Sequence, residues 1–121
     1  MENEVPTMKE RNLEALVAQL TWMPQRFQGG IHSVGTQAIL RGILMHMEKT
    51  KPSFRRMTRK KLAAAAAQYL ADYDSLVEIV SREYPPGAAF LKGQTDLMTA
   101  SILGQLAAAL SAAQKPRWGE W

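Results

Sequence analysis

Hydrophobic residues recur through most of this chain at spacings of three and four, which is the period of an amphipathic helix. The alternation of apolar and polar residues that indicates a β-strand is nearly absent, and alanine, leucine, methionine and glutamine are frequent. The pattern therefore predicts an all-α protein. We expect four helices, separated by segments that contain proline or glycine, at roughly 7–23, 34–49, 59–84 and 87–114.

The first two predicted helices are short. Thr7 and Glu10 have the spacing of a capping box, in which each side chain accepts a hydrogen bond from the other residue's backbone N–H. Pro24 ends this helix because proline has no N–H to donate, and a loop is expected from Pro24 to Ser33. Pro52 prevents the second helix from continuing. The apolar face of that helix consists of Ala38, Ile39, Leu40, Ile43 and Met47.

The last two predicted helices are longer. Between 59 and 84 the apolar residues have the heptad spacing of a helix that packs on another helix, and Pro85-Pro86-Gly87 is expected to stop it. These heptad positions are Leu62, Ala66, Tyr69, Tyr73, Leu76 and Val80. The final helix can pause at Gly93. Small residues recur in it every four positions, which would let two helix backbones approach closely, at Ala100, Gly104, Ala108 and Ala112.

These elements predict a four-helix, bundle-like single domain over residues 1–121, with two short N-terminal helices and a long C-terminal helical hairpin. At a rise of 1.5 Å per residue, each of the last two helices would be about 40 Å long and each of the first two about 25 Å. Short helices cannot cover long ones completely, and large exposed apolar patches are rare on monomers. We therefore expect a homodimer.

Composition fits this picture. The 121 residues are 46% hydrophobic and 21% charged, which is typical of a globular protein. Because there is no cysteine, disulfides, thiol nucleophiles and thiolate metal sites are excluded. The segment from Met1 to Glu4 is acidic, unlike the cationic start of a signal peptide, so a cytoplasmic protein is expected.

One uncharged stretch, 97–113, resembles a membrane span and is followed by Lys115 and Arg117. A spanning helix needs about 20 mostly apolar residues, whereas this stretch is shorter, rich in alanine and interrupted by polar side chains. We expect a buried core helix rather than a membrane segment.

The basic residues are strongly clustered. Seven of the fifteen lie in the segment 49–61, which has no Asp or Glu, whereas the other 108 residues carry a formal charge of −3. A patch of this kind attracts phosphates or carboxylates. Three of its cations begin the helix predicted from 59, where they oppose the helix dipole, so a docked anion would explain their position. The seven are Lys49, Lys51, Arg55, Arg56, Arg59, Lys60 and Lys61.

If the ligand is nucleic acid, these cations would contact phosphates and Phe54 could stack on a base. The segment 60–84 is interpreted as one helix without a turn, so a helix-turn-helix is not expected. The alternative is a solvated run of charges with local contacts to Glu48 or to the acidic N-terminus.

Catalytic and metal-binding patterns are weak. His32 and His46 are far apart, and neither has a second histidine at metal-ligand spacing. The segment 30–37 has the glycine spacing of a phosphate-binding loop, but Thr36 and Gln37 stand where lysine and serine or threonine are required. We therefore expect no enzymatic activity, no cofactor and no bound metal.

We expect the function to be binding to another protein. Tryptophan is enriched at interface hot spots, and the chain ends with two of them close together. We predict a small, non-catalytic helical regulator or adaptor, for example an antagonist that sequesters a transcription factor. The alternative is a nucleic-acid-binding accessory protein without sequence specificity that uses 49–61, and a minor one is binding to anionic lipids. The protein-interface candidates are Leu103, Leu106, Leu110, Trp118 and Trp121.

Overall fold

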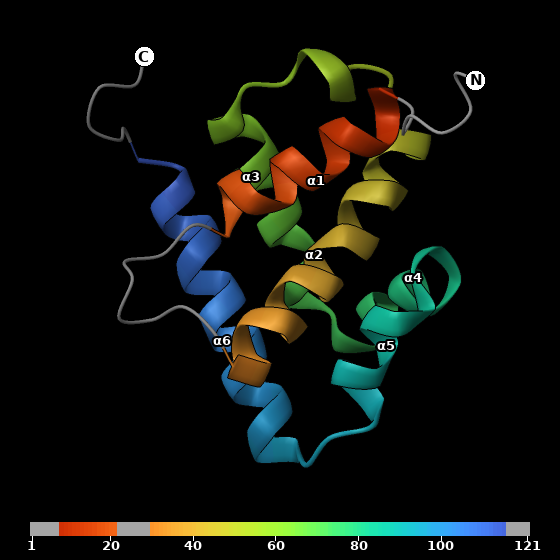
Figure 1. Ribbon diagram of the computed structural model, residues 1–121, viewed down its shortest axis with the longest axis vertical. Coiled ribbons are helices and arrows are strands. Elements are labelled where there is room, and N and C mark those ends of the chain that lie inside the picture. The colour runs from red at the N-terminus through yellow and green to blue at the C-terminus, as the bar shows by residue number, and fades with distance from the viewer. Residues whose placement is uncertain (1–7, 22–29, 116–121) are drawn as a thin grey trace, which may run out of the picture.

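The computed structural model describes residues 8–21 and 30–115, and all regular structure in this part of the chain is helical (Figure 1). The predicted all-α class is confirmed. Two single 3₁₀ turns accompany the α-helices. The elements are α1 (Met8–Leu20), α2 (Gly30–Thr50), η3 (Phe54–Arg56), α3 (Arg59–Gln68), η4 (Tyr69–Ala71), α4 (Tyr73–Glu83), α5 (Pro85–Lys92) and α6 (Asp96–Ala113).

Helix α2 is the centre of the fold. It contacts each of the other α-helices, with α6 on one side, α4 and α5 on the other and α1 across it (Figure 1). The helix begins at Gly30, so the loop expected to extend to Ser33 ends earlier than predicted. Its five buried large apolar residues form the middle of the core and are fully inaccessible to solvent: Ile39, Leu40, Ile43, Leu44 and Met47.

The single helix predicted from 59 to 84 is instead two helices that pack on different neighbours. Helix α3 ends at Gln68, and after η4 the backbone of Asp72 is extended, with φ −125° and ψ 101°. The Asp72 side chain accepts a hydrogen bond from the backbone N–H of Ser75 at 3.3 Å, so it caps α4. Aspartate favours this position because its carboxylate satisfies an otherwise free N–H group. Helix α3 packs on α6, whereas α4 packs on α2 and α5.

The predicted C-terminal hairpin is divided in the same way. Pro85 ends α4, as expected, but it is also the first residue of α5, where its missing N–H is harmless. The pause at Gly93 is confirmed because α5 ends at Lys92. Thr95 then caps α6 by accepting a hydrogen bond from the N–H of Met98 at 3.1 Å. The described residues therefore form six α-helices rather than four.

The small residues of α6 do not meet another helix among residues 8–21 and 30–115. Ala100, Gly104, Ala108 and Ala112 are all exposed, and a Cβ atom added at Gly104 would have nothing within 4 Å. The predicted close approach is therefore wrong within the part of the chain that the structure describes. The inward face of α6 is formed by Thr99, Ile102, Leu106, Ala109, Leu110 and Ala113.

Among the described residues, α6 is the helix whose length and composition would allow it to cross a membrane, and 33% of it is buried within the protein.

Candidate functional site

The basic segment lies at one end of the molecule, along η3 and the start of α3 (Figure 1). Thr58 caps α3, since its Oγ1 accepts a hydrogen bond from the N–H of Lys61 at 3.2 Å. One of the N–H groups that an anion was expected to use is therefore already satisfied within the chain.

Arg59 has a structural role. Its Nε donates to the carbonyl oxygen of Ala113 at 2.9 Å, and its Nη2 donates to that of Lys115 at 2.8 Å. These carbonyls lie at the C-terminal end of α6, where a helix carries partial negative charge and lacks intrahelical donors. The position of Arg59 at the start of α3 is thus explained by α6, and it does not require an anion.

Two further cations of the segment pair with acidic side chains. Lys49 Nζ lies 2.7 Å from Glu83 Oε1, and Arg55 Nη2 donates to Glu48 Oε2 at 3.1 Å. The contact with Glu48 is the one that the alternative interpretation, a solvated run of charges, includes. The remaining four cations have no ion pair with an acidic residue in the described part of the chain, and we call them the unpaired cations: Lys51, Arg56, Lys60 and Lys61.

Phe54 does not lie where base stacking would place it. Its side chain is only 5% exposed and belongs to the hydrophobic core. It lines a hollow of about 310 Å³ with Leu13, Leu16, Met57 and Leu62. Stacking on a base would require Phe54 to leave this packing, so its predicted role is not compatible with the folded chain.

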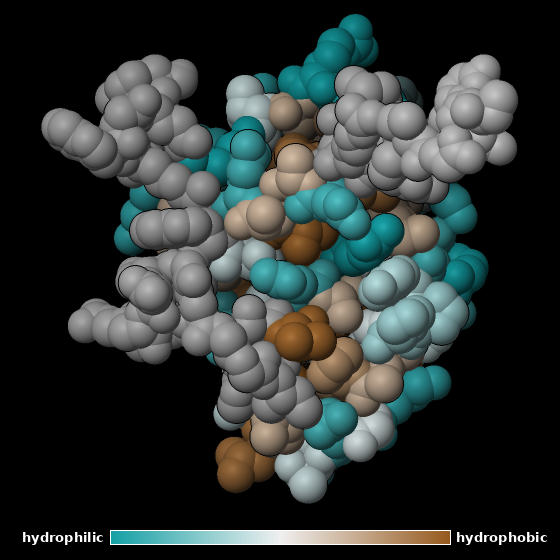
Figure 2. All heavy atoms as spheres, in the orientation of Figure 1, coloured by the Kyte–Doolittle hydropathy of each residue, from teal (hydrophilic) through white to brown (hydrophobic). Residues whose placement is uncertain are grey.

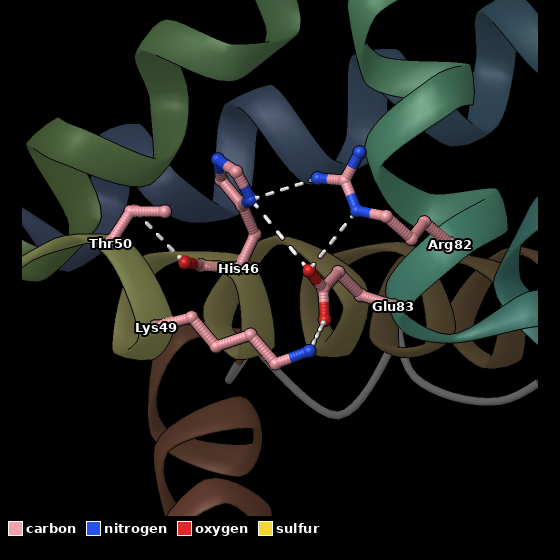
Figure 3. Close-up of polar contacts among 5 residues, drawn as sticks. All are labelled: His46, Lys49, Thr50, Arg82 and Glu83. Atoms are coloured by element: carbon pink, nitrogen blue, oxygen red, sulfur yellow. Dashed lines mark hydrogen bonds and ion pairs between the residues drawn. The ribbon is translucent and has the colours of Figure 1, made fainter.

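The structure brings together a polar cluster that the sequence analysis missed. Glu83, from α4, has a side chain that is 3% exposed, and it points between α2 and α4 (Figure 3). Besides Lys49, its carboxylate lies 3.4 Å from Arg82 Nε and 3.8 Å from His46 Nδ1. Arg82 Nη2 lies 3.3 Å from the same nitrogen of His46. No local pattern links α2 to α4, so only packing could reveal this contact.

Electrostatics keep Glu83 ionised. The hydrogen bond from Lys49 is the main cause, and with the charges of Lys49 and Arg82 it holds the pKa of Glu83 below its usual value of 4.5 despite the opposing effect of burial. A carboxylate stabilised in this way is a weak general base at neutral pH. The arrangement fits a polar link between α2 and α4. The part of the chain that the structure describes contains no group of three or more residues that could hold a metal ion.

The predicted protein-interface residues fall into three groups. Leu106 and Leu110 are fully buried in the core, so their side chains are not available to a partner in this conformation. Leu103 is half-buried. Trp118 and Trp121 lie outside the described residues.

The exposed residues of α6 make a different surface, which we call the α6 outer face. It has no charged side chain between Asp96 and Lys115. Leu97, near its start, is 79% exposed. Figure 2 shows exposed hydrophobic atoms at the lower end of the molecule, where Figure 1 places the start of α6. The face consists of Leu97, Ala100, Ser101, Gly104, Ala107, Ala108, Ser111 and Ala112.

Helices α3 and α4 are joined by a short turn, so the earlier reason for excluding a helix-turn-helix does not hold. The start of α4 is nevertheless acidic at the surface, where Asp72, Asp74 and Glu78 are exposed. These carboxylates would repel the phosphates of DNA. The helix pair therefore gives no support to sequence-specific recognition.

No protein-family model matches this sequence, no curated protein is significantly similar to it, and no solved structure matches its fold.

Proposed function

We propose that this protein acts without catalysis, by binding another protein, and that the partner covers the α6 outer face. A small regulator that sequesters a regulatory protein would act in this way. The observation that carries the proposal is Gly104, because glycine in the middle of a helix costs about 1 kcal/mol relative to alanine. Nothing in the described part of the chain requires it, since an added Cβ would meet no atom within 4 Å.

A close partner would explain this residue. Helix α6 has 18 residues and is therefore about 27 Å long, and its outer face is uncharged over nearly that whole length. Small side chains let the backbone of a second helix approach, so that extended van der Waals contact replaces water. Glycine at the centre of the face allows the nearest approach.

A second copy of the chain is one partner that fits this face. Two identical α6 helices would meet through the same surface, as in other isologous dimers. The homodimer expected from the sequence is therefore part of this proposal, and sedimentation equilibrium of the purified protein measures it directly.

The α6 outer face is tested by the substitution Gly104→Arg. The long charged side chain points into open space, so the fold should persist while partner binding is lost. Wild-type and variant proteins would be compared by sedimentation and by quantitative affinity capture from the source cells. Lys60→Glu, an exposed change on α3, is the control and should retain the partner. If Gly104→Arg keeps both its mass in solution and its captured proteins, the proposal is wrong.

A second candidate function is binding of a polyanion such as nucleic acid by the unpaired cations. It is favoured by their lack of acidic partners in the described part of the chain and by the absence of Asp and Glu from 49–61. Four phosphate contacts on duplex DNA would give a log–log slope of affinity against salt of about −3.6. Binding of this type would be largely independent of sequence.

The test is fluorescence anisotropy of labelled duplexes and single strands, from about 50 to about 300 mM salt. The triple variant Arg56→Glu, Lys60→Glu, Lys61→Glu should abolish binding, since attraction becomes repulsion. Lys92→Glu changes an exposed charge on α5 and serves as the control. Arg59 is left intact because it caps α6. Equal binding by the triple variant and the control would exclude this function.

A further inference from the structure

A second hollow, of about 340 Å³, lies between α1, α2 and the residue that precedes α5. One of its lining residues is an arginine, and three others are aliphatic. This hollow does not include any residue of the α6 outer face or of the unpaired cations. Its lining residues are Glu14, Val17, Val34, Gln37, Ala38, Arg41 and Tyr84.

Arg41 is the unusual member of this set. Its guanidinium lies over the ring of Tyr84, 5.0 Å from the centroid. Its Nε is buried without a hydrogen-bond partner, and Arg41 forms no ion pair with Glu14 or with any other acidic residue in the described part of the chain. Arg41 as a whole is half-buried, but this one buried donor is left unsatisfied, and an anion that enters the hollow would accept a charge-assisted hydrogen bond from the guanidinium.

The walls around Arg41 are held in place by backbone contacts. The N–H of Tyr84 donates to the carbonyl of Val80 at 2.8 Å, and the N–H of Gly87 donates to the carbonyl of Tyr84 at 2.9 Å. Gly87 in turn lies so close to α2 that an added Cβ would be 2.7 Å from the carbonyl oxygen of Ala38. A hollow formed in advance loses little conformational entropy when a ligand binds.

The other lining residues define the ligand. Val17, Val34 and Ala38 supply apolar surface, and Val34, near the start of α2, is 57% exposed. The volume is at the lower end of the range for ligand sites, which is about 300–1,000 Å³. Glu14 also lines the hollow, and its negative charge opposes any anion there, a doubly charged one more than a singly charged one. We propose that the hollow binds a single carboxylate attached to a small apolar body.

The same chemistry is present in a short aliphatic acid and at the C-terminus of a peptide that ends in an apolar residue. Titration of isotope-labelled protein with hexanoate, followed by NMR, should give saturable shifts of the amides of 34–41 and Tyr84. Hexanol has the same body without the charge and should bind far more weakly. A short peptide that ends in leucine, compared with its C-terminal amide, shows which source binds more tightly.

Two variants test the role of the lining residues. Arg41→Gln removes the cation, and Val34→Asp adds a negative charge at a largely exposed position that tolerates a polar side chain. Each should weaken hexanoate binding about tenfold or more. Leu97→Asp introduces the same charge at an exposed residue of α6 and should leave the affinity for hexanoate unchanged. Gly104→Arg should leave it unchanged as well.

The proposal is overturned if neither hexanoate nor the peptide shifts these amides. It is also overturned if hexanol binds as tightly as hexanoate, or if both variants retain wild-type affinity. These results do not depend on partner binding at the α6 outer face, so the two proposals can fail separately.

Discussion

Alanine at Gly87 is expected to lower the free energy of unfolding by about 1–3 kcal/mol, which is the usual cost of overpacking. The added Cβ would lie 2.7 Å from the carbonyl oxygen of Ala38 and 2.9 Å from Cγ1 of Val80. Val80 is fully buried, and the oxygen belongs to the backbone of α2, so neither close contact is easily relieved. Because α2 contacts every other α-helix, moving it disturbs the whole core.

Urea unfolding followed by circular dichroism measures this effect, and Gly104→Ala is the matched control. The chemical change is the same, but nothing lies within 4 Å of the new atom. Alanine also favours the helix, so this variant should gain about 0.5–1 kcal/mol. A loss of stability at Gly104, or none at Gly87, would contradict the packing described for α2, α5 and α6.

The substitution Glu83→Gln is expected to destabilise the protein by about 1–2 kcal/mol at pH 7. Glutamine preserves the shape but removes the charge that pairs with Lys49 and Arg82. The carboxylate is almost fully buried, whereas the side chains of Lys49 and Arg82 are 62% and 55% exposed. Solvent therefore weakens each pair, and the loss is smaller than for a fully buried pair.

The dependence on pH identifies the charge as the cause. The pKa of Glu83 is lowered in the folded protein, so its ionised form favours folding above the unfolded value of about 4.5. That contribution is lost as the pH falls through the lower folded pKa. The difference in unfolding free energy between wild type and Glu83→Gln should therefore be full at pH 7 and shrink below pH 4.5. Glu78→Gln, exposed on the same helix, should show almost no difference at either pH.

Several features of the fold follow from local chemistry and were predictable. The helical class comes from the spacing of apolar residues. Thr58 caps α3 by accepting a hydrogen bond from the N–H of Lys61, only three residues further along the chain. Pro85 ends α4 and Gly93 separates α5 from α6. The break at Asp72 was not predicted because an aspartate inside a regular apolar pattern also fits an exposed position of one continuous helix. Only the packing of α3 and α4 on different neighbours favours the break.

The candidate sites were only partly predictable for the same reason. The sequence located a cationic segment, but it could not separate Lys60 and Lys61, which are exposed, from Arg59, whose acceptors lie at the far end of the chain. Nor could it show that Phe54 is buried, because an aromatic residue in a short polar segment fits either surface or core.

The sequence by itself determined that this protein is helical, where most of its helices begin and end, and where its positive charge is concentrated. These properties depend on interactions between residues that are close in the chain. Only the tertiary structure decided which cations are paired, which face of α6 is exposed, and that Arg41 lies over Tyr84 beside a hollow. Those outcomes depend on contacts between distant segments, and a pattern of neighbouring residues carries no information about which segments meet.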